Sequence, residues 1–319
     1  MLRLMRFIII TILASLPFWS FSQGCSDAGF CTMGAMKPDQ SYNKRIDIKL
    51  RSIEFNYYRG TSLLTAVIHA ATVDFNLGIN DYSAFQIKVP YQWAKGNLGE
   101  NGGLSDISLS YTRTLKTTEK WNINGTLGTK IPSGDANKTV NNEFTGGRDV
   151  PLHMYYQNSL GSFDAIAGIS AISGKWLFAT GVQVALTENG NQFVWPDFPG
   201  YPDPEYLQSH NIGRDLKRGI DVMLRIERNW RFTNFNFSLG ALPIWRVTKD
   251  EGFAPMETER SKIDGTTGMA LSVLGSFGYQ FDVNNGIKII RGIKVTDRDV
   301  NPDGLTRNDV WSVSYIYKF

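Results

Sequence analysis

The chain has few residues of the types that build metal centres. Its 319 residues include only two cysteines, Cys25 and Cys31, and three histidines. Two cysteines six residues apart, without a neighbouring histidine, do not supply the four ligands of a zinc site. The segment 135–143 lacks the glycine and the terminal glutamate of a calcium-binding loop. We therefore expect no metal site and no cofactor.

Net charge and long apolar runs are also scarce. The formal net charge is only +3, which gives no reason to expect nucleic acid or another polyanion as a partner. No stretch of 18 apolar residues follows residue 24, and this excludes a helical inner-membrane protein. Glycine and aromatic residues, in contrast, are plentiful, with 31 glycines and 13% aromatic residues.

Residues 1–24 have the three-part pattern of a secretory signal peptide. Arg3 and Arg6 precede 13 uncharged residues, and Ser22 and Gly24 stand at −3 and −1 of a possible cleavage site before Cys25. The apolar run is too short to span a membrane as a helix. We therefore expect export to a compartment in which thiols oxidise.

The two cysteines allow two interpretations. Cleavage after Gly24 would make Cys25 the first mature residue, as in a lipoprotein, but Ser22 stands where an acylation signal normally has leucine. Cleavage after Gln23 would instead leave Cys25 and Cys31 to form a disulfide, which we favour. Because the loop is small, the disulfide would add only about 2–3 kcal/mol of stability. Its expected role is to keep the tip of a luminal or periplasmic plug, residues 25–44, compact.

Strict alternation of apolar and polar residues recurs from residue 45 to the C-terminus. A period of two over ten or more residues predicts strands long enough to cross a bilayer at a tilt, which takes about 9–11 residues. The even number of strands is typical of bacterial outer-membrane barrels. The twelve predicted strands are 45–59, 61–77, 80–93, 104–115, 119–132, 162–173, 175–187, 214–228, 230–246, 266–281, 284–297 and 307–319.

The connections between these strands alternate in length. Apart from a tight first hairpin near Gly60, short links follow the even-numbered strands and longer links follow the odd-numbered ones. Transmembrane barrels have short periplasmic turns and long external loops, whereas a soluble sandwich has no reason to sort loops by side. We expect long external loops at 133–161, 188–213 and 247–265.

The last strand carries a further signal. The chain ends on an aromatic residue that is preceded by large apolar residues at alternate positions. This resembles the signature by which outer-membrane barrels are recognised for assembly, so we expect barrel-assembly machinery as a partner. The residues on that face are Trp311, Val313, Tyr315, Tyr317 and Phe319.

These patterns predict an all-β protein, a transmembrane antiparallel up-and-down barrel of about 12 strands spanning 45–319, in the outer membrane of a Gram-negative-type bacterium. Membrane lipids would surround it. Two details fit less well. The apolar parity changes within the first strand, which suggests a bulge or a later true start of the strand. Arg291 falls on the apolar face, where mid-membrane exposure would cost about 2–4 kcal/mol unless it lies at a bulge or near the rim.

Three segments resemble a known family. They are GGLSDISLSYTRTL at 102–115, LGTKIPSGD at 127–135 and PLHMYYQNSLGSFDAIAGISAI at 151–172. They resemble outer-membrane proteins associated with the meta-pathway of phenol degradation, which are related to the FadL-type channels. Ser133 replaces the threonine of the family's turn motif, and residues 159–162 are a degraded form of its glycine turn. The resemblance implies passive uptake of small hydrophobic or aromatic compounds, with an N-terminal segment folded into the lumen.

Charged residues of both signs occupy the polar parity of the strands, so we expect them to line the lumen. They could form a structural network of ion pairs or determine the selectivity of a pore, because buried charges need partners in either case. These candidates are Glu54, Lys88, Asp106, Lys130, Asp221, Arg225, Glu227, Lys288 and Lys294.

The loop at 188–213 combines aromatic residues with four prolines. Proline stiffens a loop and aromatic side chains supply apolar contact area, so this loop could capture a hydrophobic ligand or act as a lid. Alternatively, it folds over the barrel mouth and buries its own aromatic side chains. The candidates are Phe193, Trp195, Phe198, Tyr201 and Tyr206.

An enzyme is the remote alternative. Outer-membrane lipid hydrolases and acyltransferases need a serine beside a histidine, and nucleophilic catalysis needs such an adjacent base. His69 lies on the apolar parity, and His153 and His210 lie in predicted loops. We therefore expect no enzymatic activity. The main alternative to a channel is a structural or partner-binding barrel with a closed lumen.

Overall fold

The computed structural model describes residues 33–37, 49–62, 65–209, 213–253, 257–305 and 307–319. The predicted signal peptide 1–24, Cys25 and Cys31 lie outside these residues, as does most of the predicted plug 25–44. The plug and the disulfide therefore stay predictions. No helix in the described part of the chain is long and apolar enough to cross a membrane.

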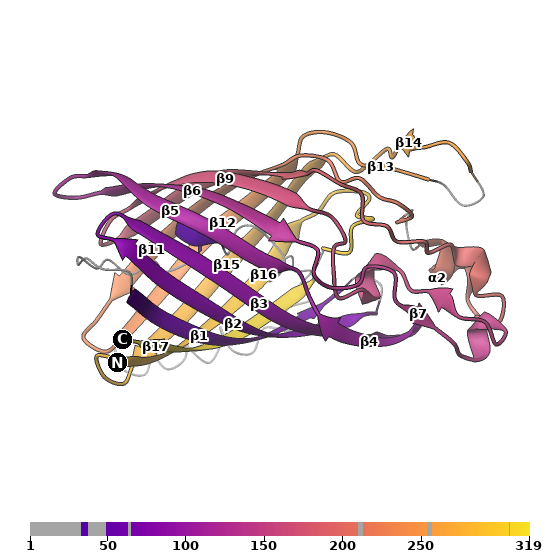
Figure 1. The fold of residues 1–319 in the computed structure, drawn as a ribbon, viewed down its shortest axis with the longest axis horizontal. Coiled ribbons are helices and arrows are strands. Elements are labelled where there is room, and N and C mark those ends of the chain that lie inside the picture. Colours follow the sequence, from indigo (N-terminus) through magenta and orange to yellow (C-terminus); the bar gives the residue numbers. More distant parts are fainter. Residues whose placement is uncertain (1–32, 38–48, 63–64, 210–212, 254–256, 306) are drawn as a thin grey trace, which may run out of the picture.

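The strands form a closed antiparallel barrel of 12 strands with one extra strand, β4. Neighbours in sequence pair all round the ring, and the pairing of β1 with β17 closes it (Figure 1). The strands of the ring are β1 (Lys49–Thr61), β2 (Val67–Asn80), β3 (Ser83–Gly96), β5 (Ile107–Thr117), β6 (Asn122–Ile131), β9 (Asp164–Ile172), β10 (Trp176–Ala185), β11 (Asp221–Arg231), β12 (Phe235–Arg246), β15 (Gly268–Gln280), β16 (Asn285–Thr296) and β17 (Asp309–Lys318).

Each strand of the ring turns one set of side chains inward and the other outward. In β17, Ser312 and Ser314 are buried, whereas Trp311, Val313 and Tyr315 are exposed. The middle of the outer wall is apolar as well, since Leu127 is 65% exposed. Exposed aromatic side chains lie near both ends of this wall, as in the girdles of membrane barrels. Those near the short turns are Trp176, Phe178, Trp230, Phe232, Phe235, Phe281 and Phe319, and those near the long loops are Tyr57, Tyr91, Phe163 and Trp311.

Short turns and long connections lie at opposite ends of the barrel. The turns after β2, β5, β9, β11 and β15 have two to four residues, and the C-terminus lies at their end (Figure 1). The long connections contain short elements that project from the other end of the barrel. These elements are β7 (Thr139–Val140), η3 (Glu143–Thr145), β8 (Val150–Pro151), η4 (Met154–Tyr156), η5 (Trp195–Asp197), α2 (Pro204–Ser209), β13 (Glu251–Gly252) and β14 (Ser261–Lys262).

The structure corrects one predicted connection and explains one irregular strand. The segment after the third predicted strand is not a loop: β3 turns at Asn97–Leu98 into β4 (Gly99–Leu104), which pairs back along β3. The chain then continues into β5, so this hairpin extends the wall towards the long loops. The expected bulge in β1 is confirmed, because its register against β2 shifts between Leu50 and Ser52.

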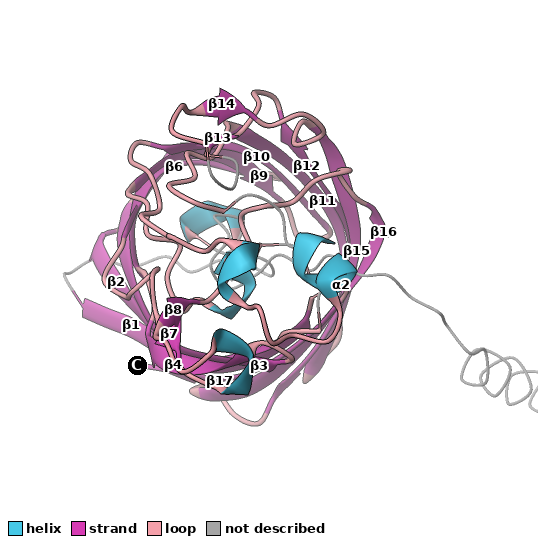
Figure 2. Cartoon of the chain, turned by 90° about the vertical axis from the view of Figure 1, so that its right-hand side faces the viewer, coloured by secondary structure: helices cyan, strands magenta, loops and turns pink. Residues whose placement is uncertain are grey.

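A short helical turn from the N-terminal segment lies inside the barrel. This turn, η2 (Gly34–Met36), contacts β5, β6, β9 and β10. Gly34 has a φ of +49°, and a Cβ there would approach both Thr112 and Thr126 to 2.5 Å. Glycine fits this position because it tolerates both the left-handed backbone and the close wall. Figure 2, which looks along the barrel, shows helical turns and loops within the ring of strands.

Candidate functional site

The interior of the barrel is lined with charged side chains. All nine residues predicted to line the lumen have inward positions, and each is at most 8% exposed. Four of them form ion pairs with one another: Lys130 with Asp106, and Arg225 with Glu227. Lys294 instead pairs with Asp297, just beyond the end of β16. The charges are therefore at least partly matched within the wall, and a role in selectivity stays a prediction.

One cavity lies within this charged interior. The empty space between its walls, counted together with adjoining open solvent, is about 680 Å³. Its wall comes from β1, β2, β3, β11, β15, β16 and β17, so it lies in the lumen on the side where the barrel closes. Its charged lining consists of Lys37, Glu54, Asp74, Lys88, Arg225 and Lys288.

Lys37 crosses from the N-terminal segment to the barrel wall. Its Nζ lies 2.6 Å from Oε2 of Glu54 on β1 and 2.8 Å from Oδ2 of Asp74 on β2. Burial alone would lower the pKa of Lys37, but the charges of Asp74 and Glu54 outweigh burial and raise it above its usual value. Lys37 is therefore charged at neutral pH and neutralises part of the cavity's acidic lining.

The backbone of this segment is also fixed to the wall. The amide of Gly34 donates to Oε1 of Gln86 at 2.7 Å, and Nε2 of Gln86 donates to Asp74 at 2.6 Å. Met33 and Met36 pack on the other side against Ile166 and Met223. Residues 33–37 therefore contact the wall through polar groups on one side and apolar groups on the other, and they narrow the lumen.

A second charged centre lies where β12 reaches the long loops. Arg246 is 2% exposed and donates to three carboxylates: Asp221 at 2.7 and 2.9 Å, Asp250 at 2.8 and 2.9 Å, and Asp303 at 2.8 Å. Burial alone would raise the pKa of Asp303, but the charges of Arg246, Arg298 and Arg218 hold it well below its usual range. Because Asp250 and Asp303 belong to two different loops, this centre fixes both loops to the wall.

The segments that carry the family resemblance come together beside this centre. Asp106 accepts hydrogen bonds from the hydroxyl of Ser159 and, at 2.9 Å, from the amide of Leu160. The hydroxyl of Ser133 donates to the carbonyl of Ser105 at 2.7 Å and accepts from the amide of Ile107. These motifs therefore hold the first long loop against the strand ends, which is a structural task rather than a catalytic one.

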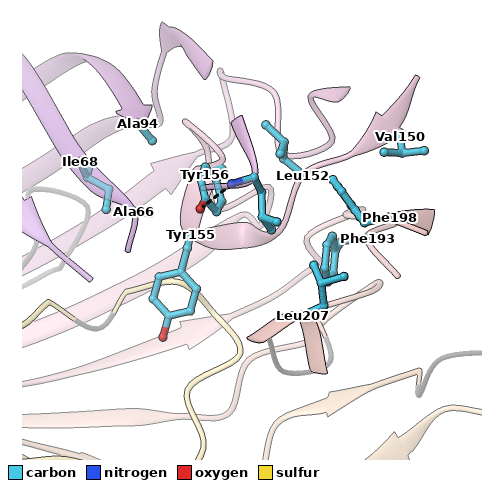
Figure 3. Close-up of a cluster of buried hydrophobic side chains, with 11 residues drawn as sticks. Ala66, Ile68, Ala94, Val150, Leu152, Tyr155, Tyr156, Phe193, Phe198 and Leu207 are labelled. Atoms are coloured by element: carbon cyan, nitrogen blue, oxygen red, sulfur yellow. Dashed lines mark hydrogen bonds between the residues drawn. The ribbon is translucent and has the colours of Figure 1, made fainter. Parts of the chain in front are cut away.

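The loop at 188–213, which we call the aromatic loop, packs against the mouth of the barrel, at the end that carries the long loops. Phe193 and Phe198 are only 4% and 2% exposed, and they share a cluster with Ile68 and Leu98 of the β2 and β3 region (Figure 3). We call this the mouth cluster; its buried members are Ala66, Ile68, Ala94, Leu98, Val150, Leu152, Tyr155, Tyr156, Phe193, Phe198 and Leu207. Trp195, Tyr201 and Tyr206 pack at its edge and are partly buried.

This packing narrows the predicted capture site. Phe193 and Phe198 are buried. This agrees with the alternative in which the loop folds over the barrel mouth and covers its own aromatic side chains. Tyr206 accepts or donates a hydrogen bond with Thr65 at 2.7 Å and stacks on Tyr201 with ring centroids 5.4 Å apart. Any capture surface would therefore have to use Trp195, Tyr201 and Tyr206, and that role stays a prediction.

The two histidines that the structure describes, His69 and His153, lie in different parts of the fold. His69 faces outward from β2, and its Nδ1 lies 2.8 Å from the hydroxyl of Tyr57. His153 is buried and caps η4 by accepting from the amide of Tyr155. His210 lies outside the described residues. Within the parts that the structure describes, no group of three or more His, Cys, Asp or Glu side chains could hold a metal ion.

Sequence reasoning missed several charged members of the interior. Asp74 and Arg246 follow the same inward parity as the nine predicted residues and could have been found from it. Asp303 lies in a loop, where no parity applies. Arg218 falls on the outward parity of the predicted strand 214–228, but β11 begins only at Asp221, and Arg218 donates to Asp164 at 2.5 and 2.6 Å. Lys37 lies in the predicted plug 25–44, but no local signal pairs it with Glu54 and Asp74.

Comparison with known proteins shows the fold only. No protein-family model and no curated protein matches the sequence. Among solved structures, an outer-membrane channel from Pseudomonas putida F1 covers 88% of this chain and 100% of its own, with 11% identity and a TM-score of 0.56. The NanC porin covers 84% and 98% at 8% identity and a TM-score of 0.46. The CymD monoaromatic hydrocarbon channel covers 93% and 94% at 10% identity and a TM-score of 0.39.

Proposed function

We propose that this protein is an outer-membrane channel through which small hydrophobic or aromatic compounds enter passively. The observation that carries the proposal is the open cavity in the lumen, which lies within a closed barrel whose outer wall is apolar. A wall of this kind suits a bilayer, because every backbone group of a closed barrel is paired and no sheet edge meets lipid. The solved structure with the same fold from Pseudomonas putida F1 is itself an outer-membrane channel.

The membrane location rests on three features of the chain. The outer wall has an apolar middle with aromatic side chains near both rims, long loops lie at one end only, and the N-terminus has the pattern of a signal peptide. The C-terminal strand presents Tyr315, Tyr317 and Phe319 outward. We further propose that this strand is what the barrel-assembly machinery recognises.

The preference for aromatic compounds rests on the mouth of the barrel. Trp195, Tyr201 and Tyr206 lie at the edge of the mouth cluster, where an aromatic molecule could stack before it enters. The cavity below is lined by Lys88, Lys288 and other charged side chains. An aromatic ring that carries a polar group, such as a phenol, would match both environments. This agrees with the resemblance to the phenol meta-pathway family.

A closed structural or partner-binding barrel is the second candidate. It is favoured by the ion pairs across the interior and by residues 33–37, which occupy part of the lumen. In this case the long loops, rather than the lumen, would carry the function. The observed wall and loops are compatible with both candidates. The two differ in whether a solute passes through the lumen.

Electrical recording separates the two candidates. Purified protein in planar bilayers is expected to conduct ions, and an alkylphenol added to one side is expected to reduce the conductance in a concentration-dependent manner. Proteoliposomes should take up the alkylphenol faster than empty vesicles, which measure its direct permeation through lipid. Absence of both conductance and excess uptake would favour the closed barrel. Conductance that the alkylphenol leaves unchanged would retain the channel but refute the aromatic substrate class.

A further inference from the structure

Five outward-facing residues form one row across five neighbouring strands. In the strand register, Arg291 lies opposite Trp311, Trp311 opposite Arg59, Arg59 opposite His69, and His69 opposite Trp93. The row therefore runs around the wall from β16 through β17, β1 and β2 to β3. Sequence order gives no hint of it, because its members are scattered from residue 59 to residue 311. We call it the basic-aromatic row.

Two neighbouring pairs of this row are in direct contact, and Arg59 lies between them in the register. The guanidinium of Arg291 lies 4.7 Å above the ring of Trp311, and the rings of His69 and Trp93 stack with centroids 5.3 Å apart and planes 6° apart. The row is accessible: Trp311 is 40% exposed and the side chain of Arg291 is 46% exposed. It therefore gathers cationic and aromatic groups on one stretch of the outer wall.

The positive charge of the row exceeds what its surroundings neutralise. Asp309 is the carboxylate beside it, with Oδ1 3.5 Å from Nε of Arg291 and Oδ2 accepting from the indole of Trp311 at 3.1 Å. Within the described residues, Arg59 has no such ion pair. Of the two guanidinium groups of the row, only that of Arg291 has a carboxylate partner, on a surface that the proposed location turns towards lipid.

Three members of the row lie near the ends of their strands that face the long loops, whereas Arg291 is the seventh of the twelve residues of β16. Arg59 and His69 are the third residues from the ends of β1 and β2 that face the long loops, and Trp311 is the third residue of β17. Tryptophan and tyrosine favour the level of the lipid head groups, and arginine binds phosphate oxygens with its planar pair of donors. At that level the uncompensated charge meets phosphate groups instead of hydrocarbon.

We propose that the basic-aromatic row binds the phosphate-bearing head group of an anionic membrane lipid at the long-loop end of the barrel. The inference rests on the proposed membrane location but is independent of transport. Arg59 and Arg291 would contact the phosphate from either side of Trp311, and the rings of Trp311 and Trp93 would pack on the upper part of the acyl chains. This also explains why an arginine is tolerated on the apolar face of β16.

Native mass spectrometry of the purified barrel tests the proposal. The protein is inserted into nanodiscs that contain equal amounts of phosphatidylglycerol and phosphatidylcholine. It is then released from the nanodiscs in the mass spectrometer, and the lipid molecules that stay bound to it are counted. We expect retained lipid to be mainly phosphatidylglycerol. Each arginine should contribute about fivefold to this preference, so R59Q and R291Q together should reduce it by more than tenfold.

The barrel itself provides the matched control. Arg228 is another outward-facing arginine, with its guanidinium 4.9 Å from Trp176 and 5.8 Å from Trp230, but it lies near the short turns and outside the row. R228Q should keep the lipid preference, and R59K should keep most of it because the charge remains. Heat-modifiable mobility on gels verifies that each variant is folded.

The outcomes separate this inference from the proposed function. Equal retention of phosphatidylglycerol by wild type and by the double variant R59Q/R291Q, or equal loss in R228Q, would overturn the lipid site. A folded protein that inserts and prefers phosphatidylglycerol but does not conduct supports the lipid site and counts against the channel. A protein that does not enter nanodiscs overturns both the membrane location and the lipid site.

Discussion

Lys37 and Asp74 form an ion pair in the lumen, with Nζ 2.8 Å from Oδ2. Lys37 belongs to the N-terminal segment and Asp74 to β2, so the pair fixes the segment to the wall beside the cavity. Gln86 also donates to Asp74 and accepts from the amide of Gly34. The backbone of the N-terminal segment is therefore bound to the same part of the wall as Lys37. The conductance of the barrel should therefore depend on this pair.

Replacement of Lys37 by methionine should change ion selectivity. The substitution keeps the length of the side chain but leaves the carboxylates of Glu54 and Asp74 without their shared cation. A lumen with more uncompensated negative charge attracts cations. We expect higher conductance and a reversal potential, measured in planar bilayers under a salt gradient, that shifts towards cation selectivity.

The matched control for this experiment is Lys138→Met. Lys138 lies in the first long loop with a side chain that is 46% exposed, and it does not line the cavity. Its replacement should leave the reversal potential unchanged. If Lys37→Met has the same reversal potential as wild type, residues 33–37 do not control the conducting path.

Replacement of Arg246 by methionine should destabilise the barrel strongly. The substitution leaves Asp221, Asp250 and Asp303 buried without their common cation, and loss of one partner of a buried ion pair costs about 3–5 kcal/mol. We expect the urea concentration at the midpoint of unfolding to be lower. The change in gel mobility between the folded and the heat-unfolded barrel measures the folded fraction. Arg113→Met, at an exposed position of β5, should have little effect. An unchanged midpoint for Arg246→Met would show that the loops are held by other contacts.

Acid should loosen the long loops only below about pH 4. The pKa of Asp303 in the folded protein is well below the unfolded value of about 3.9, so its stabilising contribution is complete above that value. The contribution is then lost as the pH falls through the folded pKa. Asp250, whose pKa is raised by burial, acts in the opposite direction.

The variant Asp303→Asn isolates this effect. It should melt at a lower temperature than wild type at pH 7, and the difference between the two proteins should shrink between about pH 4 and pH 2. Thermal unfolding followed by circular dichroism at each pH measures this. A difference that stays constant over that range would show that folding does not lower the pKa of Asp303.

An arginine in the middle of the outer wall should oppose folding into lipid. Leu127 lies midway along β6 and is 65% exposed, so Leu127→Arg places a charge in the hydrocarbon region and should cost about 2–4 kcal/mol. Val283→Arg, in a short turn with 87% exposure, is the control and should cost almost nothing. Refolding into lipid vesicles measures both. Equal folding of the two variants would argue against the proposed orientation in a membrane.

Removal of Phe198 should release the aromatic loop from the mouth. Phe198 is 2% exposed and contacts Phe193, with ring centroids 5.7 Å apart. Truncation of a buried phenylalanine costs about 3–5 kcal/mol, and here the loss should fall on the loop rather than on the strands. We expect faster proteolysis between residues 188 and 213 in Phe198→Ala than in Phe232→Ala, which alters an exposed turn. Equal cleavage rates would mean that the mouth cluster does not order the loop.

Local patterns in the sequence were sufficient to predict the wall of the barrel. The alternation in the last strand, with Trp311 and Tyr315 on one face and Ser312 and Ser314 on the other, matches the observed exposure. Such alternation is local because successive side chains of a strand point to opposite faces whatever the strand pairs with. The same rule placed all nine predicted charged residues on the inner face.

Local patterns failed where the structure depends on chain segments that are distant in sequence. Residues 94–103, which form the end of β3 and most of β4, lack a clear alternation and were predicted as a loop. The burial of Phe193 and Phe198 depends on β2 and β3, which come more than 90 residues earlier. A loop of mixed aromatic and proline residues allows both an open and a folded conformation, and only its packing partners decide between them.

The sequence alone determined which strand residues face outward and which face the lumen, because that depends only on the period of a strand. The tertiary structure decided which charges meet. Arg246 reaches Asp303 across 57 residues, Lys37 reaches Asp74, and Arg59 lies beside Trp311 only because β1 pairs with β17. These contacts depend on the register that closes the barrel, and register is set by pairing across strands rather than by the order of residues within one.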